Sequence, residues 1–394
     1  MLYPYEKKFN VVVNINIRDV IVYTCIASFP YFFLTLGDVN VSLFDVLLLT
    51  LLPIVSFHRK KVKIVSGTFY ALSTCVIVLS ILPLLSYAES LEYVWGTLQM
   101  MYILLVMYPL ITSVISEKRY RISLKAACIV WSFFLLFNVG VVNDLKYYEA
   151  AGRFTSLYNS PLSLGLTTAV IIPLLLSFTN STKSLLLKLL FSLSVLLGIF
   201  YIYISGSRAS ALGLALGLVF YLLTTKRYGV LSATFCISTL VLTYGYSYVS
   251  PDISQVRDLS NRLFVDTSLR EINRVLFSPN TDASLLLFGA GIGNGSLYNV
   301  TRPHNFFISM AEELGISGML IFAWIMYLSL GKGIILTLFK GFRFDKNRNL
   351  KLATLSSGIV FFVALLVSAV PLHRGYWFIL ALCFWTINTK KHKA

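Results

Sequence analysis

Apolar residues in this chain stand in long runs, which short polar stretches separate. The runs are about 17–22 residues long, and a helix of that length crosses a hydrocarbon core ~30 Å thick. The pattern therefore predicts an all-α, polytopic integral membrane protein with about 12 transmembrane helices in a single membrane domain, residues 1–394. The expected helices span residues 20–36, 41–57, 64–86, 94–115, 123–142, 161–178, 185–204, 209–225, 230–248, 312–336, 352–370 and 375–389.

Composition supports the same fold class. The chain is 57% hydrophobic and 13% charged, with a mean hydropathy of +0.77, whereas soluble domains carry about 25% charged residues. The first apolar run begins near Val20 and is not followed by a small-residue cleavage site, so a removable signal peptide is not expected. All five cysteines fall inside apolar runs, which predicts buried thiols and neither a disulfide framework nor a metal site.

The net charge of +16 is distributed unevenly along the chain. If the N-terminus is cytoplasmic, the inside segments hold 24 of the 33 lysines and arginines. This asymmetry predicts that both termini are cytoplasmic, because positive residues concentrate on the inner side of membrane proteins. Most of the charge is therefore a topology signal, and nucleic acid is not an expected partner.

The nine cations on the outer side are a different population. Eight of them are arginine, whereas the inside set contains 17 lysines and 7 arginines. Arginine binds phosphate through a planar fork of donors and stays charged, so the choice favours an anionic ligand. The alternative is ordinary salt bridges with external carboxylates such as Asp258 and Glu271. The nine cations are Lys146, Arg153, Arg208, Arg257, Arg262, Arg270, Arg274, Arg302 and Arg374.

One long external loop is expected between the ninth and tenth helices, at residues 249–304. Loops of this length are usually functional or disordered. It contains the amphipathic stretch "SLREINRVLFSP", which predicts short helices lying on the membrane surface. The stretch "FGAGIGNG" near its end follows no strand pattern, and we interpret it as a tight turn that closes the loop, not as a nucleotide site.

Four external stretches precede helices that run inward: "GRFTSLYNSP", "SGSRAS", "RPHN" and "PLHRGYW". A helix N-terminus presents free N–H groups and the positive end of the helix dipole, and both favour anions. Each of the four stretches contains an arginine. If the four helix ends are neighbours, they would form a cradle for a pyrophosphate.

Arg208 and His304 are the most informative single residues. Arg208 follows only "SGS" between two apolar runs, where a charge is costly and usually functional, although a snorkelling anchor is the alternative. Nearby arginines and a helix N-terminus favour a neutral imidazole at His304, which suits a general base. Its alternative is a helix cap together with Asn305. Glu312 and Glu313 follow two turns later, and either could pair with an arginine.

The sequence has no D-x-D or other paired acidic metal motif, so neither a metal nor another cofactor is expected. Arginines would then neutralise the charge that a cation neutralises in other transferases. A flippase or another transporter of an anionic substrate is a weaker alternative, because it would need charges deep in both halves of the membrane. The expected helix interiors contain almost none.

Together, "GRFTSLYNSPLSLG", "SGSRASALGLALG", "LREINRVLF" with "LLLFGAGIGNG", and "RPHNFFISMAEELGISG" resemble the O-antigen polymerase/O-antigen ligase superfamily of bacterial envelope enzymes. The four stretches occur in the family's order over residues 150–330. Two details depart from the family pattern. Arg274 stands where the family often has tryptophan, and eleven residues separate Arg153 from Gly165, one more than in the polymerase pattern.

The resemblance implies a GT-C-like, metal-independent glycosyltransferase on the outer face of the bacterial cytoplasmic membrane. Its donor would be an oligosaccharide on polyprenyl (undecaprenyl) pyrophosphate, and its partners would include membrane lipids, a chain-length regulator and a flippase. We favour a polymerase of lipid-linked repeat units over a ligase that transfers glycan to lipid A–core. The implied catalytic residues are Arg208, Arg270 and His304, and the implied substrate-binding residues are Arg153, Arg274, Arg374 and Asn305.

Overall fold

The structure is a computed structural model. Of the expected features, the helix at 230–248 and most of the helices at 20–36 and 41–57 and of the loop 249–304 lie outside the residues that it describes. Those residues are 24, 35–36, 39–40, 46–47, 49–50, 67–81, 91–114, 117–144, 146, 154–156, 161–226, 283–291, 305–339, 347–366 and 374–388.

The described chain is helical apart from two antiparallel two-residue strands. In chain order the elements are β1 (Thr35–Leu36), β2 (Val39–Asn40), α3 (Gly67–Ile81), α5 (Leu91–Met101), η1 (Tyr102–Met107), α6 (Tyr108–Val114), α7 (Glu117–Val141), α8 (Pro161–Ser181), α9 (Leu185–Ile204), α10 (Arg208–Thr225), α14 (Ala283–Phe288), α15 (Phe306–Met326), η4 (Tyr327–Gly331), α16 (Lys332–Phe339), α17 (Arg348–Leu365) and α18 (Arg374–Asn388). The segments η1 and η4 are π-helical and continue the α-helices on either side of them.

Seven helices in the described part of the chain are long and apolar enough to cross a membrane. They are Val94–Thr112, Arg119–Val141, Pro161–Ser181, Leu185–Ile204, Arg208–Thr225, Phe306–Phe339 and Arg348–Leu365. Two shorter apolar helices, Phe69–Ile81 and Trp377–Asn388, coincide with two further expected spans. The prediction of a polytopic helical membrane protein is confirmed, and the total of about 12 spans stays a prediction.

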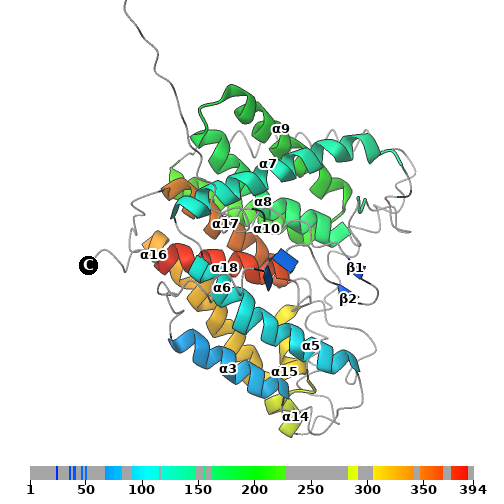
Figure 1. Cartoon of the computed structure of the whole chain (residues 1–394), viewed down its shortest axis with the longest axis vertical. Helices are drawn as coiled ribbons and strands as arrows, with labels where there is room; N and C mark the ends of the chain where they lie inside the picture. Colours follow the sequence, from blue (N-terminus) through cyan, green and yellow to red (C-terminus); the bar gives the residue numbers. More distant parts are fainter. Residues whose placement is uncertain are drawn as a thin grey trace, which may run out of the picture.

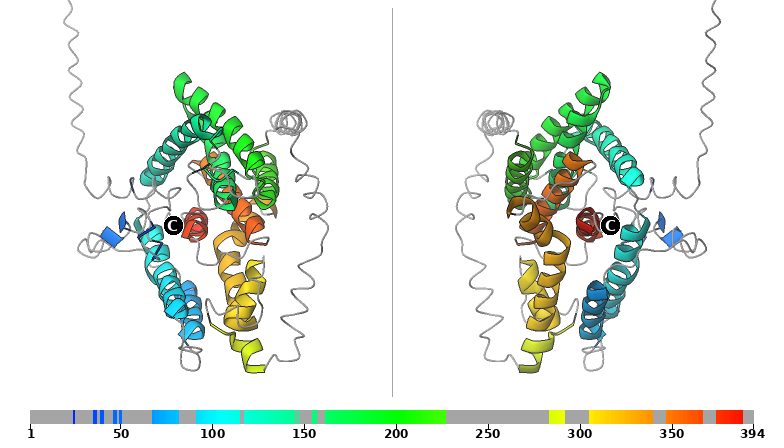
Figure 2. Two further views of the ribbon diagram at one scale, coloured as in Figure 1. Left: turned by 90° about the vertical axis from the view of Figure 1, so that its right-hand side faces the viewer. Right: turned by 90° about the vertical axis from the view of Figure 1, so that its left-hand side faces the viewer.

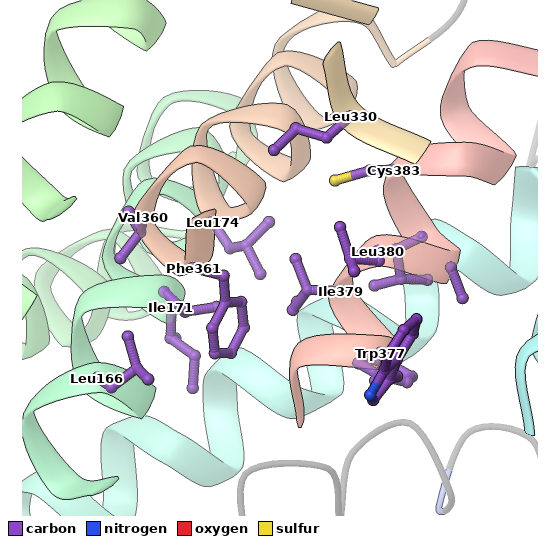
Figure 3. Close-up of a cluster of buried hydrophobic side chains, with 14 of the residues drawn as sticks. Leu166, Ile171, Leu174, Leu330, Val360, Phe361, Trp377, Ile379, Leu380 and Cys383 are labelled. Atoms are coloured by element: carbon purple, nitrogen blue, oxygen red, sulfur yellow. The ribbon is translucent and has the colours of Figure 1, made fainter. Parts of the chain in front are cut away.

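The helices form two groups joined by a central pair. Helices α7, α8, α9 and α10 make one group, and α3, α5 and α15 lie on the other side of α17 and α18 (Figures 1 and 2). Figure 3 shows the contact between the central helices, where Phe361 of α17 faces Ile379 of α18 and Ile171 of α8 lies on its other side. These side chains are almost fully buried, so the core of the bundle runs through α17.

Small residues let α17 approach α8 and α10 closely. A Cβ at Gly213 would lie 2.7 Å from the carbonyl oxygen of Val360, so only glycine fits there. The hydroxyl of Ser356 donates to the carbonyl of Gly217 at 2.6 Å, and that of Ser357 donates to the carbonyl of Val170 at 2.6 Å. Close backbone approach and interhelical hydrogen bonds are the usual means of helix association in lipid, where burial of apolar surface provides no driving force.

The helix ends sort into two opposite ends of the bundle. At one end Arg348 of α17 donates to the carbonyl of Thr224 in α10 at 3.1 Å. At the other end Gly213, near the start of α10, packs on Val360, and the ring of Phe307 lies 6.2 Å from that of Phe362. Helices α10 and α17 are therefore antiparallel, and the N-termini of α10 and α15 lie at the same end of α17. We call this end the Arg208 end and the opposite one the Arg348 end.

Candidate functional site

The first part of the site is the Arg208 junction, which we define as residues 154–156, Gly165 and residues 205–210. The backbone N–H of Phe154 donates to the carbonyl of Ile204 at the end of α9, at 3.2 Å. Phe154 is fully buried, and its ring stacks on Tyr201 at 5.7 Å between centroids. The residues directly after Arg153 are thereby fixed against the turn that leads into Arg208, and two of the four motif stretches meet.

Gly165 brings α8 against the same turn. A Cβ at this position would lie 2.7 Å from Cβ of Ser207 and 2.9 Å from Oγ of Ser205. Real Cβ atoms do not tolerate such distances, so any side chain would push α8 away from the turn. The glycine that ends the first motif stretch therefore serves close packing. Its spacing from Arg153 in the sequence gave no direct signal of which element it would contact.

The turn itself places Arg208 at the first position of α10. Gly206 has a φ of 61°, and Ser205 donates its hydroxyl to the carbonyl of Ile202 at 2.8 Å. Arg208 is half-buried, and the first turn of α10 contains no acidic residue. The expectation that Arg208 opens a helix is confirmed. The positive end of the helix dipole repels the guanidinium charge of Arg208. The two positive charges together favour an anion bound at this helix start.

A hydrogen bond that the sequence did not indicate ties α7 to this junction. Ser156 donates its hydroxyl to the side-chain oxygen of Asn138, and both residues are buried. Ser156 has a φ of 55°, a conformation that costs energy for a residue with a side chain. The strain and the buried amide together fix the path of the segment after Arg153.

The second part is the broken-helix junction, which we define as residues 287–291 and 312–317. The backbone N–H of Ala290 donates to the carbonyl of Glu312 at 2.9 Å, and that of Gly291 donates to Glu313 at 2.7 Å. Ser317 adds a hydroxyl bond to the carbonyl of Leu287 at 2.6 Å. The "FGAG" part of the glycine-rich stretch bends at Ala290 and docks on the "EELG" stretch through these hydrogen bonds, and the expected tight turn over residues 288–295 stays a prediction.

Helix α15 differs from the expected helix at 312–336. It begins at Phe306 and breaks at Gly315, whose φ of 70° and ψ of 179° are open essentially only to glycine. The break releases the carbonyls of Glu312 and Glu313 from the helix, and the turn at residues 290–291 takes them up. The rings of Phe306 and Phe322 come within 5.7 Å, because the chain folds back at the break. Hydropathy alone did not reveal this, since the apolar pattern continues through Gly315.

The two glutamates of this junction are buried. Glu312 is 3% exposed and Glu313 is 8% exposed, and Ser309 donates its hydroxyl to Glu313 Oε1 at 3.5 Å. Carboxyl groups within a membrane helix are costly and are functional by default. Their expected pairing with an arginine stays a prediction.

Asn305 caps α15. Its side-chain oxygen accepts from the N–H of Phe307 at 2.9 Å and from the N–H of Ile308 at 3.4 Å. The capping interpretation is therefore confirmed for Asn305, and its oxygen is occupied by the backbone. Only the amide group of the side chain remains for a substrate. The residue directly before this cap is His304, which lies outside the described residues.

Other expected site residues have mixed outcomes. Arg374 is the first residue of α18, as expected for a helix start. Aromatic residues of the external stretches, Tyr158, Tyr298 and Trp377, could stack on sugar rings. For Trp377 this prediction is wrong, because the ring is 2% exposed and packs on Phe322 at 5.4 Å between centroids. Tyr158 and Tyr298 lie outside the described part of the chain, as do Arg153, Arg270 and Arg274.

Lys146 forms a salt bridge, which was the alternative to anion binding for the external cations. Its ammonium group lies 2.9 Å from a carboxylate oxygen of Asp144, and both side chains are exposed. The side-chain hydrogen bond from Lys146 lowers the pKa of Asp144 below its usual range, with a further contribution from the backbone N–H of Lys146. Lys146 is therefore engaged at the surface next to the end of α7.

The two junctions lie at the same end of the bundle. The start of α10 and the start of α15 flank the C-terminal end of α17, through the contacts of Gly213 with Val360 and of Phe307 with Phe362. The described parts of the four motif stretches thus meet in two pairs at the Arg208 end. No group of three or more His, Cys, Asp or Glu side chains that could hold a metal occurs among the residues the structure describes. Comparison with protein-family models and with curated proteins gives no match to this chain.

Proposed function

We propose that the chain is a bacterial inner-membrane glycosyltransferase that polymerises lipid-linked oligosaccharide repeat units on the outer face of the membrane. The observation that carries the proposal is the position of Arg208. It opens α10 at a packed junction, half-buried, with no acidic residue in the first helical turn. The guanidinium and the helix dipole both attract an anion to this position, and arginine binds phosphate groups such as those of a pyrophosphate through paired donors.

The proposed reaction is a displacement at the anomeric carbon of the donor glycan. The acceptor sugar hydroxyl forms the new bond to that carbon as the bond to the pyrophosphate oxygen breaks. The hydroxyl proton passes to His304, and polyprenyl pyrophosphate leaves with the bonding electrons. Arg208 and Arg270 neutralise the charge that develops on the leaving group, which is where electrostatic stabilisation contributes most. Arg153, Arg274 and Arg374 line the path of the donor.

The broken-helix junction supports this assignment of roles. Backbone hydrogen bonds from Ala290 and Gly291 fix the segment that ends at Gly315, and Asn305 caps the other end of the same segment. A general base must be held within hydrogen-bonding reach of its proton. The residue next to this doubly anchored segment is His304, so the rigidity of the segment suits a base in that position.

The proposal includes an orientation in which both termini are cytoplasmic and the Arg208 end faces outward. The excess of cations in the segments at the Arg348 end supports it. A ligase that uses lipid A–core as acceptor is the alternative, since it needs the same donor site. A flippase is the weaker alternative, because the cations gather at the ends of the helices.

The direct experiment uses the purified chain with a polyprenyl-pyrophosphate-linked repeat unit, first alone and then with lipid A–core. A ladder of products from the repeat alone establishes a polymerase. Product only in the presence of lipid A–core establishes a ligase. No product in either tube, with the cognate repeat and active control enzymes, contradicts the proposal and favours the transporter.

Arg208 variants test the role of the guanidinium. We expect Arg208→Ala to lower turnover by about 10²–10³-fold, as loss of one charge-stabilising donor does in other enzymes, and Arg208→Lys to recover only part of it because a lysine lacks the paired donors. Arg348→Ala is the matched control, since it removes the same side chain at the opposite end of α10 and α17. Normal turnover in a well-expressed Arg208→Ala protein would overturn the mechanism.

A further inference from the structure

A cleft of about 320 Å³ lies at the Arg348 end of the bundle, on the face opposite to the candidate site. It is formed where α7 begins and where α8 turns into α9, and Phe178 and Leu187 supply its apolar side. Its polar lining consists of Arg121, Lys125, Ser181, Thr182, Lys183 and Ser184. None of these residues was singled out as a site by the sequence analysis.

The cleft is positively charged. Arg121 and Lys125 come from α7, and Lys183 comes from the turn between α8 and α9. Among the residues that the structure describes, no carboxylate lines the cleft and none of the three cations forms an ion pair. Three like charges around one concave surface repel one another, so an anion placed between them lowers the electrostatic energy of the folded protein.

Neutral donors face the same space. Thr182 is only 9% exposed, its N–H bonds the carbonyl of Phe178 at 2.9 Å, and its hydroxyl makes no hydrogen bond within the described residues. Ser184 caps α9 by accepting from the N–H of Leu187, and the first turn of α9 contains no acidic residue. The Thr182 hydroxyl is therefore available to donate to a ligand or to water in the cleft.

The surroundings of the cleft define the kind of anion. Leu185, Leu186 and Leu189 project from the first turns of α9 and are among the most exposed apolar side chains of the chain. In a membrane these leucines face acyl chains, while the cleft lies at the level of the headgroups. The volume suits one headgroup and is at the lower limit of small-molecule sites.

We propose that this cleft binds the phosphate of an anionic phospholipid in the cytoplasmic leaflet, with the acyl chains lying along the exposed leucines of α9. Arg121, Lys125 and Lys183 surround the phosphate, and the hydroxyl of Thr182 donates to one of its oxygens. Basic pockets between transmembrane helices on the cytoplasmic side recognise such headgroups. The inference depends on the orientation of the bundle and not on the proposed transferase activity.

The test measures lipid retention by the purified full-length protein in native mass spectrometry. Phosphatidylglycerol and phosphatidylcholine with the same acyl chains are offered at equal concentration. The variant Arg121→Gln/Lys183→Gln removes two exposed cations of the cleft. The matched control is Lys226→Gln/Lys332→Gln, which removes the same charge outside the cleft.

The wild-type protein and the control variant should retain phosphatidylglycerol in preference to phosphatidylcholine. The cleft variant should bind phosphatidylglycerol about 10–30-fold more weakly, given the contribution of each basic residue near an anionic membrane surface. Thr182→Val, which keeps the shape of the side chain, should weaken binding severalfold without changing net charge. Equal retention by the wild-type protein and the cleft variant would overturn the proposal, as would an equal loss in both double variants.

Inorganic phosphate distinguishes a lipid from a free anion. We expect millimolar phosphate neither to displace phosphatidylglycerol from the protein nor to raise its Tm in phosphatidylcholine nanodiscs, because the acyl contacts along α9 are missing. A phosphate-dependent rise in Tm that the cleft variant loses, without selective retention of phosphatidylglycerol, would assign the cleft to a soluble phosphate and overturn the lipid proposal.

Discussion

The two junctions at the Arg208 end hold neighbouring helices together in different ways. At the Arg208 junction, Gly165 approaches the side-chain atoms of Ser205 and Ser207. At the broken-helix junction, a Cβ at Gly315 would lie 2.2 Å from the backbone carbonyl of Leu287, and one at Gly289 would lie 2.4 Å from the backbone of Glu313. At the first junction the glycine therefore packs against side chains, and at the second the two glycines pack against backbone atoms.

This difference determines what each junction tolerates. A clash with a side chain is relieved when the neighbouring side chain becomes smaller or adopts another rotamer. A clash with a backbone is not relieved by any substitution of the neighbour, and both Gly289 and Gly315 also have positive φ. The broken-helix junction should thus be the more rigid of the two. This rigidity suits the end of the bundle that contains the proposed base.

The largest effect is expected from Gly315→Ala. The substitution combines a backbone conformation that costs about 1–3 kcal/mol for residues other than glycine with the steric overlap at Leu287. We expect the free energy of unfolding in mixed detergent to fall by more than about 3 kcal/mol, with a lower folded yield. Gly140→Ala is the control, because Gly140 lies in α7 with no atom within 4 Å of the added Cβ. A Gly315→Ala protein as stable as the Gly140→Ala protein would refute the backbone contact.

Gly165→Ala should have a smaller effect that can be rescued. The new methyl group overlaps Ser207 Cβ, and overpacking of this kind typically costs about 1–3 kcal/mol. Ser207→Gly removes the closest overlapping atom, so the double variant should regain part of the lost stability. A double-mutant cycle on the free energy of unfolding measures the coupling between the two positions. Additive effects would mean that α8 does not approach the turn through this glycine.

Much of the fold could be predicted from hydropathy because a membrane helix is defined by an apolar run of fixed length. Nine of the twelve expected intervals overlap helices of the described residues, and the start of α10 at Arg208 agrees with the expected boundary. The break at Gly315 was not predicted, because the apolar pattern of the sequence continues unchanged through the point where the chain reverses direction. One glycine inside a helical pattern is compatible with a continuous helix, and only contacts from Leu287 distinguish the two cases.

The sequence predicted which residues belong to the candidate site but not which residues they contact. Its position between two apolar runs indicated that Arg208 is exceptional, and the structure places it at a packed helix start. The partners of the site were not predictable, since the bond between Ser156 and Asn138 joins residues whose polarity is unremarkable in isolation. Trp377 illustrates the converse: an aromatic residue near an expected interface is buried, because α18 packs against Phe322 of α15.

A moderate effect is expected at Asn305, where two roles can be separated. Asn305→Ala removes the oxygen that accepts from Phe307 and Ile308, and loss of such a cap typically costs about 0.5–2 kcal/mol. Asn305→Ser keeps a capping oxygen and removes the amide group. If Asn305 only caps α15, the serine variant keeps both stability and turnover. If its amide also binds the substrate, the serine variant keeps the Tm of the wild type but has a higher KM, so its rate falls at low substrate concentration.

The smallest effect is expected at Asp144, outside both junctions. The hydrogen bonds from Lys146 lower the pKa of this carboxyl in the folded protein, so the pair contributes stability above the ordinary pKa of an aspartate. That contribution disappears as the pH falls through the lower folded-state value. We expect Asp144→Asn to be slightly less stable than the wild type at pH 7 and equally stable in strong acid, with unchanged turnover. Both side chains are exposed, so added salt should diminish the difference at pH 7. If Asp144→Asn is still less stable than the wild type in strong acid, the lost stability comes from packing at the end of α7. If the difference in stability grows with added salt, the ion pair is not its cause.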